Sequence, residues 1–191
     1  ETTKIPSNPF IMIPLTRRNT FTIDNLNNHN YVKPLMGRYF SNEHIESYTC
    51  EKCKIKSSMT KFRRLTAYPK ALLLHFGRKF LNHVAKEKIQ FEEELTFEDE
   101  WLDTSSNDSD CNDAQTGKRY TLKSIVRHIS FGNGGHYIAY RFVSGNDYYG
   151  KMENFKLVDR WIRVNDDSLC EINFKDTVQK CEAYMAFYEA L

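Results

Sequence analysis

Alternation of apolar and polar residues is the main pattern in the second half of the chain. Successive side chains of a strand point to opposite sides of a sheet, so a period of two predicts a strand with one buried face. Short polar loops, such as residues 144–147, separate the alternating segments. The pattern predicts an antiparallel sheet built from residues 120–129, 136–142, 156–164 and 183–189.

The first half of the chain has shorter apolar stretches and more interruptions. The continuous apolar run at 71–74 predicts a strand over 71–78 that is buried on both faces. His75, inside this strand, is expected to be an interior histidine with satisfied hydrogen bonds. Short helices are predicted at 33–40 and 174–179. Strand-like patterns are also present at 9–15, 61–67 and 88–97.

Residues 103–117 interrupt these patterns with serine, asparagine and aspartate and almost no apolar side chain. Such a segment has little to bury and is predicted to be a solvated insertion between two strands. A calcium site is the alternative, but the acidic residues lack the spacing and the closing glutamate of a calcium loop. The chain of 191 residues, with 40% hydrophobic content, is therefore predicted to be one α+β domain, mostly antiparallel β.

Charge and cysteine content limit the function classes. The 27 basic and 25 acidic side chains give a net charge of +2 and are scattered, so there is no electrostatic reason to expect nucleic acid as a partner. No apolar stretch is long enough to span a membrane, and no signal-peptide pattern opens the chain. Five cysteines, two of them in a CxxC, are more typical of a reducing compartment than of a disulfide framework. We therefore expect an intracellular setting, cytoplasm or nucleus, although a membrane anchor outside this chain is compatible with it.

The run Gly134-Gly135-His136-Tyr137 sets a histidine after two glycines and at the start of a predicted strand. Glycines allow foreign backbone to approach closely, and the strand would hold the imidazole on a rigid support. On the residues alone, however, a histidine beside glycines is more often a structural or surface residue than a catalytic one.

A second polar cluster, Asn165-Asp166-Asp167, ends the predicted strand 156–164. Amide and carboxylate oxygens can fix the tautomer of a histidine, so this cluster is suited to orient His136 as a general base. The simpler interpretation is a polar turn that ends a strand. The residues alone leave both open.

Cys50 and Cys53 form a CxxC motif. By itself the motif is compatible with half of a zinc site, a redox pair or two unrelated thiols, although the βαβ context of a thioredoxin-like motif is absent. A structural zinc site needs four ligands, and His44 is a conceivable third. The other cysteines are expected to be free thiols or core residues: Cys111, Cys170 and Cys181.

Several of these motifs occur in the order and at the spacing of one known family. The sequences GGHYIAY, WIRVNDDSL and AYMAFYE resemble the histidine box and the C-terminal strands of ubiquitin-specific proteases. Upstream, YTCEKC, Lys61 and YPKALLLHF resemble that family's zinc half-site and the strand that follows it. The resemblance covers most of the chain. The family's nucleophile motif, a cysteine that opens a helix, and its first CxxC have no counterpart here and are expected before Glu1.

The resemblance implies a papain-like cysteine peptidase that hydrolyses the peptide or isopeptide bond after the C-terminal glycine of ubiquitin. It implies the family's fingers at about 1–70 and its palm at about 71–191. The expected partners are ubiquitin, ubiquitinated proteins and the N-terminal segment of the same catalytic domain. One departure is that Phe76-Gly77-Arg78-Lys79-Phe80 separates the family's usual Arg-Phe pair by one residue.

For the site residues, the resemblance implies that His136 is the general base and that Asn165 orients it. Asp166 would share that task or help to organise the oxyanion site. The glycines would admit the slender diglycine tail of ubiquitin, because they carry no side chain. The substrate-binding residues implied in this way are Gly134, Gly135 and Tyr137.

The same resemblance assigns a structural zinc ion to Cys50 and Cys53, with the second CxxC pair expected before this chain. Two other functions stay open. One is a catalytically inactive relative that binds ubiquitin as a scaffold, and the presence of both His136 and Asn165 argues against it. The other is a zinc-stabilised β interaction domain unrelated to ubiquitin.

Overall fold

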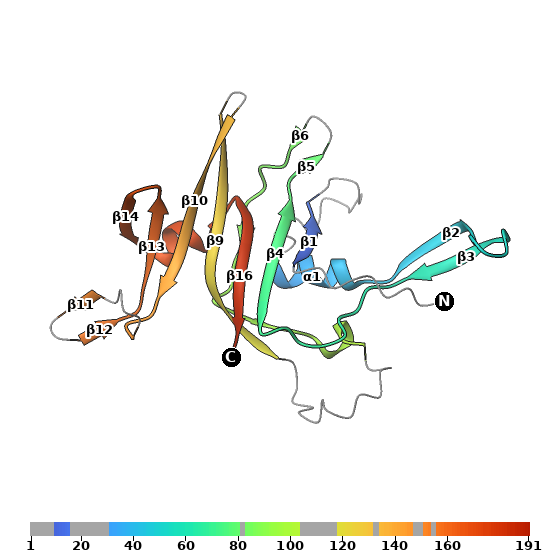
Figure 1. Ribbon diagram of the computed structural model, residues 1–191, viewed down its shortest axis with the longest axis horizontal. Coiled ribbons are helices and arrows are strands. Elements are labelled where there is room, and N and C mark those ends of the chain that lie inside the picture. The colour runs from blue at the N-terminus through green and yellow to red at the C-terminus, as the bar shows by residue number, and fades with distance from the viewer. Residues whose placement is uncertain are drawn as a thin grey trace, which may run out of the picture.

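An eight-stranded sheet forms the centre of the structure, a computed structural model that describes residues 10–15, 31–80, 83–103, 118–131, 134–146, 151–153 and 156–191. The strand order is β1-β4-β16-β9-β10-β13-β14, and β8 also pairs with β9 (Figure 1). Only β1 is parallel to its neighbour among these pairs, so the predicted, mostly antiparallel sheet is confirmed. The prediction of one strand over 156–164 is wrong, because residues 156–158 form a separate strand that pairs with 151–153 and only the strand that starts at Arg160 belongs to this sheet. The strands are β1 (Ile11–Pro14), β4 (Ala71–Gly77), β8 (Glu94–Thr96), β9 (Arg119–Phe131), β10 (Gly134–Val143), β13 (Arg160–Asn165), β14 (Ser168–Ile172) and β16 (Ala183–Ala190).

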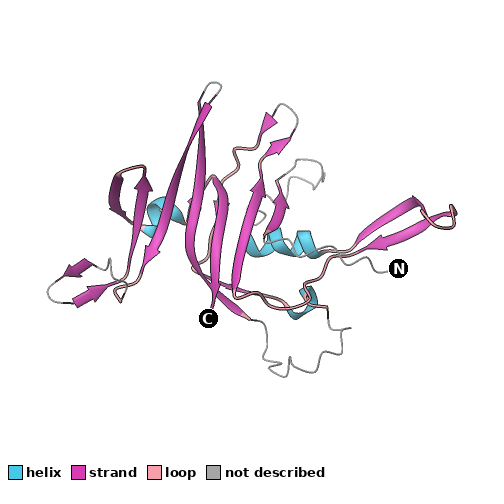
Figure 2. Ribbon diagram, in the orientation of Figure 1, coloured by secondary structure: helices cyan, strands magenta, loops and turns pink. Residues whose placement is uncertain are grey.

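Helices are a small part of the described structure (Figure 2). They are α1 (Val32–Phe40), η2 (Asp99–Trp101) and η3 (Phe174–Val178), so the helices predicted at 33–40 and 174–179 are confirmed. No helix among the described residues is long and apolar enough to cross a membrane. Small two-stranded pairs complete the fold: β2 (Glu43–Thr49) with β3 (Lys56–Lys61), β5 (Lys79–Phe80) with β6 (His83–Val84), β7 (Ile89–Gln90) with β15 (Lys180–Cys181), and β11 (Lys151–Glu153) with β12 (Lys156–Val158).

One face of the sheet is packed and the other is half-exposed. On β4, Leu72, Leu74 and Phe76 are buried, whereas the alternate side chains are half-buried or exposed. The prediction that this strand is buried on both faces is therefore wrong, because the packing layer described here covers one face only. That layer is formed by Val32, Leu35, Met36, Phe40, Ile89, Phe91, Phe97 and Trp101.

The prediction of a strand at 61–67 is wrong. β3 ends at Lys61, and the following residues make only an isolated bridge, between Leu65 and Leu102. Side-chain contacts fix this segment instead of a ladder: Arg64 Nη1 donates to the Phe40 carbonyl at the end of α1 at 2.9 Å. The hairpin that precedes it, β2–β3, projects from the end of the sheet opposite to β13 and β14 (Figure 1).

The other strand predictions of the first half hold. The segment 9–15 contains β1, and 88–97 contains β7 and β8 with a turn between them. The polar insertion predicted at 103–117 lies outside the described residues, except for its first residue.

His75 does not have the satisfied hydrogen bonds expected of it. Its imidazole Nε2 is buried and has no hydrogen-bond partner among the described residues. The ring instead makes edge contacts with Tyr184, at 4.7 Å between centroids, and with Phe10, at 5.8 Å. Burial lowers the pKa of His75, which favours its neutral form.

Arg78, the residue at which the Arg-Phe spacing departs from the family pattern, is 8% exposed. Its Nε donates to the Ala183 carbonyl at 2.5 Å, and its Nη1 donates to the carbonyls of Ala85 and Glu87, each at 2.9 Å. The guanidinium therefore ties the end of β4 to the start of β16.

Candidate functional site

His136 is the third residue of β10, a strand with neighbours on both sides. It lies opposite Ile129 of β9 in the ladder. Its side chain is 34% exposed, so the imidazole can reach a substrate while the backbone below it is fixed. A central strand is a rigid support for a catalytic group.

Asn165 is the last residue of β13, and the β10–β13 register brings it next to His136. Ala139 pairs with Val164, so continuing the antiparallel register places Asn165 level with Ile138, on the same face of the sheet as His136 and diagonally next to it. The Asn165 Oδ1 lies 2.5 Å from the His136 Nε2. An amide oxygen can only accept, so Nε2 carries the proton and Nδ1 keeps the lone pair that a general base needs.

Asp166 follows in the tight turn between β13 and β14. Its Oδ2 is 3.7 Å from the His136 Nε2, but its side chain is 79% exposed. Its backbone has φ of 49°, in the left-handed region that disfavours a residue with a side chain. By this geometry, Asn165 is the main partner of the imidazole. Asp166 is a second partner that is exposed to solvent, and its carboxylate attracts the ring only when the ring is protonated.

The two glycines lie in β10 itself rather than in a loop before it, since Gly134 pairs with Phe131 and Gly135 with Ser130. A Cβ on Gly134 would meet only the Phe131 carbonyl, at 3.9 Å. A Cβ on Gly135 would lie 2.0 Å from the Nε2 of His128. Gly135 therefore leaves room for the His128 ring.

Tyr137 points to the opposite side of β10 from His136, as strand alternation requires. It is 55% exposed and packs on His128 across the ladder, at 4.6 Å between centroids, and on Tyr184 at 5.8 Å. No motif in the sequence marks His128 as a residue of this site. His128 is identified by the β9–β10 register, which places it opposite Tyr137, where the two rings can pack across the strands.

Cys50 and Cys53 lie at the tip of the projecting β2–β3 hairpin. The Lys54 amide donates to the Cys50 carbonyl at 2.9 Å, and Lys54 has φ of 59°, which gives a tight turn around the thiols. His44 cannot join them, because six residues of extended chain separate it from Cys50, about 20 Å. No group of three metal-ligating side chains occurs in the described residues, in which Cys50 and Cys53 are two thiols of one turn.

No cysteine in the described part of the chain pairs with His136. Cys170 lies in β14 opposite Arg163, and Cys181 is 3% exposed in β15. Burial raises the pKa of Cys181 to about 11, which makes it a poor nucleophile. In the described part of the chain, the site thus holds an imidazole and an amide oxygen in contact with it, without a thiol.

Comparison with known proteins gives one family. The family model described as ubiquitin carboxyl-terminal hydrolase matches residues 15–188. Ubiquitin hydrolase B of Dictyostelium discoideum is 31% identical over 152 residues, which are 77% of this chain and 28% of that protein. Ubiquitin carboxyl-terminal hydrolase 3 of Mus musculus is 30% identical over 152 residues, 76% of this chain and 25% of that protein. The chain therefore spans about a quarter of the length of these relatives.

Solved structures with the same fold include a SAGA deubiquitinating module. The Ubp8/Sgf11/Sus1/Sgf73 module bound to ubiquitin aldehyde matches with a TM-score of 0.58 and 22% identity over 86% of this chain and 34% of that one. A yeast module with an Sgf73 mutant matches with a TM-score of 0.63 and 20% identity over 95% of this chain and 35% of that one. At this identity the likeness shows the fold alone.

Proposed function

Because this chain belongs to the ubiquitin carboxyl-terminal hydrolase family, we propose that it is the part of a cysteine-type deubiquitinase that supplies the base and its orienting amide. The observation that carries the proposal is the contact of 2.5 Å between His136 and Asn165. It supports catalysis because it leaves the other imidazole nitrogen free to take a proton.

The nucleophile would be a cysteine outside this chain, in a preceding segment. No described cysteine lies beside His136, and the relatives are about four times longer than the match. The Nδ1 of His136 would take the thiol proton, and the thiolate would attack the carbonyl carbon of the C-terminal glycine of ubiquitin. The amine would leave with the proton from Nδ1, and water activated by the same base would release ubiquitin from the thioester.

The partners of His136 would act at different stages of this cycle. Asn165 would hold the ring by accepting from Nε2–H throughout. Asp166, at 3.7 Å, would favour the imidazolium that forms after thiol deprotonation. Its exposure keeps that contribution small, because water screens the charge.

Ubiquitin and ubiquitinated proteins are the proposed substrates. The solvent-exposed start of β10 supports this, since two small residues precede the base and an exposed aromatic ring follows it. We assign Gly134 and Gly135 to contact with the ubiquitin tail. The predicted role of Tyr137 in this contact is not kept, because its ring lies on the opposite side of β10 from His136, against His128 and Tyr184. The cytoplasmic or nuclear setting stays a prediction from cysteine content.

The test uses the complete protein with ubiquitin that carries a fluorogenic C-terminal amide. We expect release of the fluorophore, loss of that release after thiol alkylation, and no release from a short fluorogenic peptide amide that lacks the ubiquitin body. Ubiquitin binding without release would contradict the hydrolase and favour a scaffold. Release that alkylation leaves unchanged would contradict a cysteine mechanism.

We also propose a structural zinc ion at the β2–β3 hairpin, held by Cys50 and Cys53 with two ligands from outside the described residues. Both thiols lie in one tight turn, as two ligands of one ion must. In the complete protein, Cys50→Ser should release the zinc and loosen the hairpin, because the binding energy of the ion orders its loop. Elemental analysis should give one zinc per wild-type molecule and much less for the variant. Ser57→Ala, on β3, is the matched control, and wild-type protein without zinc would contradict the site.

A further inference from the structure

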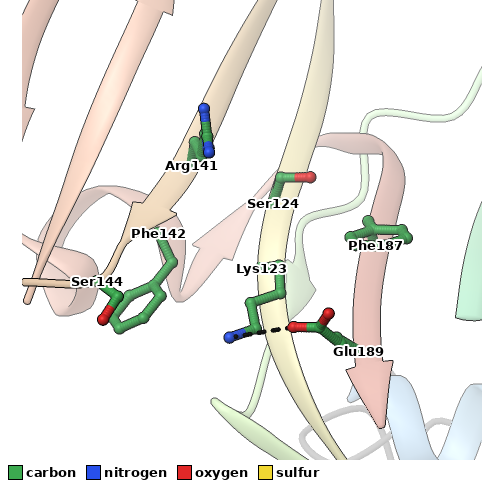
Figure 3. Close-up of a pocket in the computed structure, with 7 residues that line it drawn as sticks. All are labelled: Lys123, Ser124, Arg141, Phe142, Ser144, Phe187 and Glu189. Carbon is green, nitrogen blue, oxygen red and sulfur yellow. Dashed lines mark ion pairs between the residues drawn. The ribbon is translucent and has the colours of Figure 1, made fainter. Parts of the chain in front are cut away.

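A cavity of about 370 Å³ lies on the half-exposed face of the sheet, towards the end of β10 that is remote from His136. Figure 3 shows its side chains coming from three adjacent strands and the loop after β10, with Lys123 between Phe142 on one side and Phe187 and Glu189 on the other. The lining residues are Lys123, Ser124, Arg141, Phe142, Ser144, Phe187 and Glu189.

Strand alternation is broken at this cavity. Lys123 and Ser124 are consecutive residues of β9 and both line it, although neighbours in a regular strand face opposite sides. The cause is a register shift: Phe187 of β16 pairs with Ser124, but the next residue, Tyr188, pairs with Leu122. Lys123 is therefore the extra residue of a β-bulge. Bulges commonly redirect a side chain towards a site, and this one brings an amino group into the cavity.

The charges of the cavity suit a ligand with a single negative charge. Lys123 Nζ lies 3.4 Å from the Glu189 carboxylate and 5.4 Å from the centre of the Phe142 ring, so it is held in place. Arg141 is exposed and has no ion pair or hydrogen bond with another described residue. Two cations and one carboxylate give a formal charge of +1. A carboxylate would balance this charge and leave the cavity neutral, whereas a phosphate dianion would leave a net charge of −1 beside Glu189.

The rest of the lining suits an apolar group beside that charge. Phe142 packs edge-on against Trp161, at 5.8 Å between centroids, so its ring is fixed. Phe187 is only half-buried on the same face. The cavity is open to solvent on one side, and its volume of about 370 Å³ is larger than one carboxylate needs. Two aromatic walls beside a basic group favour an amphipathic ligand.

We propose that this cavity binds an extended peptide segment of a partner protein in which an aspartate or glutamate stands next to an apolar side chain. The carboxylate pairs with Arg141 and Lys123, and the apolar side chain packs against the exposed sides of the Phe142 and Phe187 rings. The cavity is separate from the candidate catalytic site. Arg141 is five residues from His136 along β10, about 17 Å, and points to the other face of the sheet.

The test is a heptapeptide library with one fixed residue per pool, bound to the immobilised complete protein. Pools with fixed aspartate or glutamate should be enriched at least 10-fold over the matched asparagine and glutamine pools, and an apolar residue should be preferred at an adjacent position. Inorganic phosphate at 10 mM should not compete with the selected peptide. Equal binding of the acidic and amide pools would mean that the cavity does not recognise an acidic peptide. Competition by phosphate would mean that it binds small anions in general. Either result would overturn the proposal.

Variants with opposite expected effects assign the binding to this cavity. Arg141→Gln should weaken the selected peptide at least 10-fold. Glu189→Gln should strengthen it several-fold, because it removes the competing carboxylate from Lys123. Arg163→Gln, an exposed arginine on neighbouring β13 that does not line the cavity, is the matched control and should leave peptide binding unchanged. Binding that Arg141→Gln leaves intact would refute the cavity as the site, whatever the outcome of the ubiquitin hydrolysis assay.

Discussion

Replacing His136 with alanine should lower the kcat of the complete protein on a ubiquitin C-terminal amide by about 10³-fold or more. The reason is that one imidazole both activates the nucleophile and protonates the leaving amine, so both functions disappear together. Ubiquitin binding should persist, because the bulk of a protein-protein contact is independent of one imidazole. Steady-state kinetics with an independent measurement of ubiquitin affinity checks both parts.

Variants of Asn165 separate orientation from proton transfer. Asn165→Ala should reduce kcat less than the histidine variant does, by roughly 10- to 1000-fold, because the base remains but its tautomer and direction are no longer fixed. Asn165→Asp keeps an acceptor oxygen at the 2.5 Å contact and should recover part of the loss. The control is His44→Ala, an exposed histidine on β2, which should leave kcat unchanged. Near-normal turnover of His136→Ala would refute the catalytic assignment.

Replacing Gly135 with alanine should destabilise the protein by about 1–3 kcal/mol, the usual range for forcing extra atoms into a packed site. The new Cβ would lie 2.0 Å from Nε2 and 2.6 Å from Cε1 of His128. His128 cannot move freely, because it packs on Tyr137 at 4.6 Å. Displacing this pair would shift the start of β10 beside His136, so turnover should fall as well. Thermal or denaturant unfolding measures the first effect and the ubiquitin amide assay the second.

Two companion variants identify the cause. Gly134→Ala should be nearly neutral, since its Cβ meets only the Phe131 carbonyl at 3.9 Å and neither glycine has a left-handed φ. His128→Ala should restore the stability of Gly135→Ala, which gives a coupling energy in a double-mutant cycle. Equal losses in both glycine variants, or no rescue by His128→Ala, would contradict the steric role. Turnover that stays low when stability is restored would support passage of the ubiquitin tail over Gly135.

The local pattern of the sequence was enough to identify the main strands of the sheet. β9, β10, β13 and β16 were predicted because a strand with one buried face alternates apolar and polar residues, a property of neighbouring positions alone. The same reasoning failed at 61–67, where arginine side chains, not a ladder, hold the segment against α1. It also overestimated the burial of β4, because an apolar run cannot tell how many faces of a strand will be covered.

The sequence also singled out the residues of the site by their chemistry. A histidine after glycines and an asparagine at a strand end are visible as residue types, and family resemblance gave them expected roles. Their contact is a different matter, because His136 and Asn165 are 29 residues apart and meet only through the β10–β13 register. A shift of that register by one residue would turn Asn165 to the other face of the sheet.

Only the tertiary structure decided the features that depend on non-local pairing. β16, the last strand, lies between β4 and β9, and this order brings Phe187 and Glu189 beside Lys123. The bulge that directs Lys123 into the cavity is a feature of the pairing between β9 and β16, two strands far apart in the sequence. The sequence by itself therefore determined which segments are strands and which side chains carry chemistry. Pairing across long separations decided which of those side chains meet, since hydrogen-bond register is set between strands and not within them.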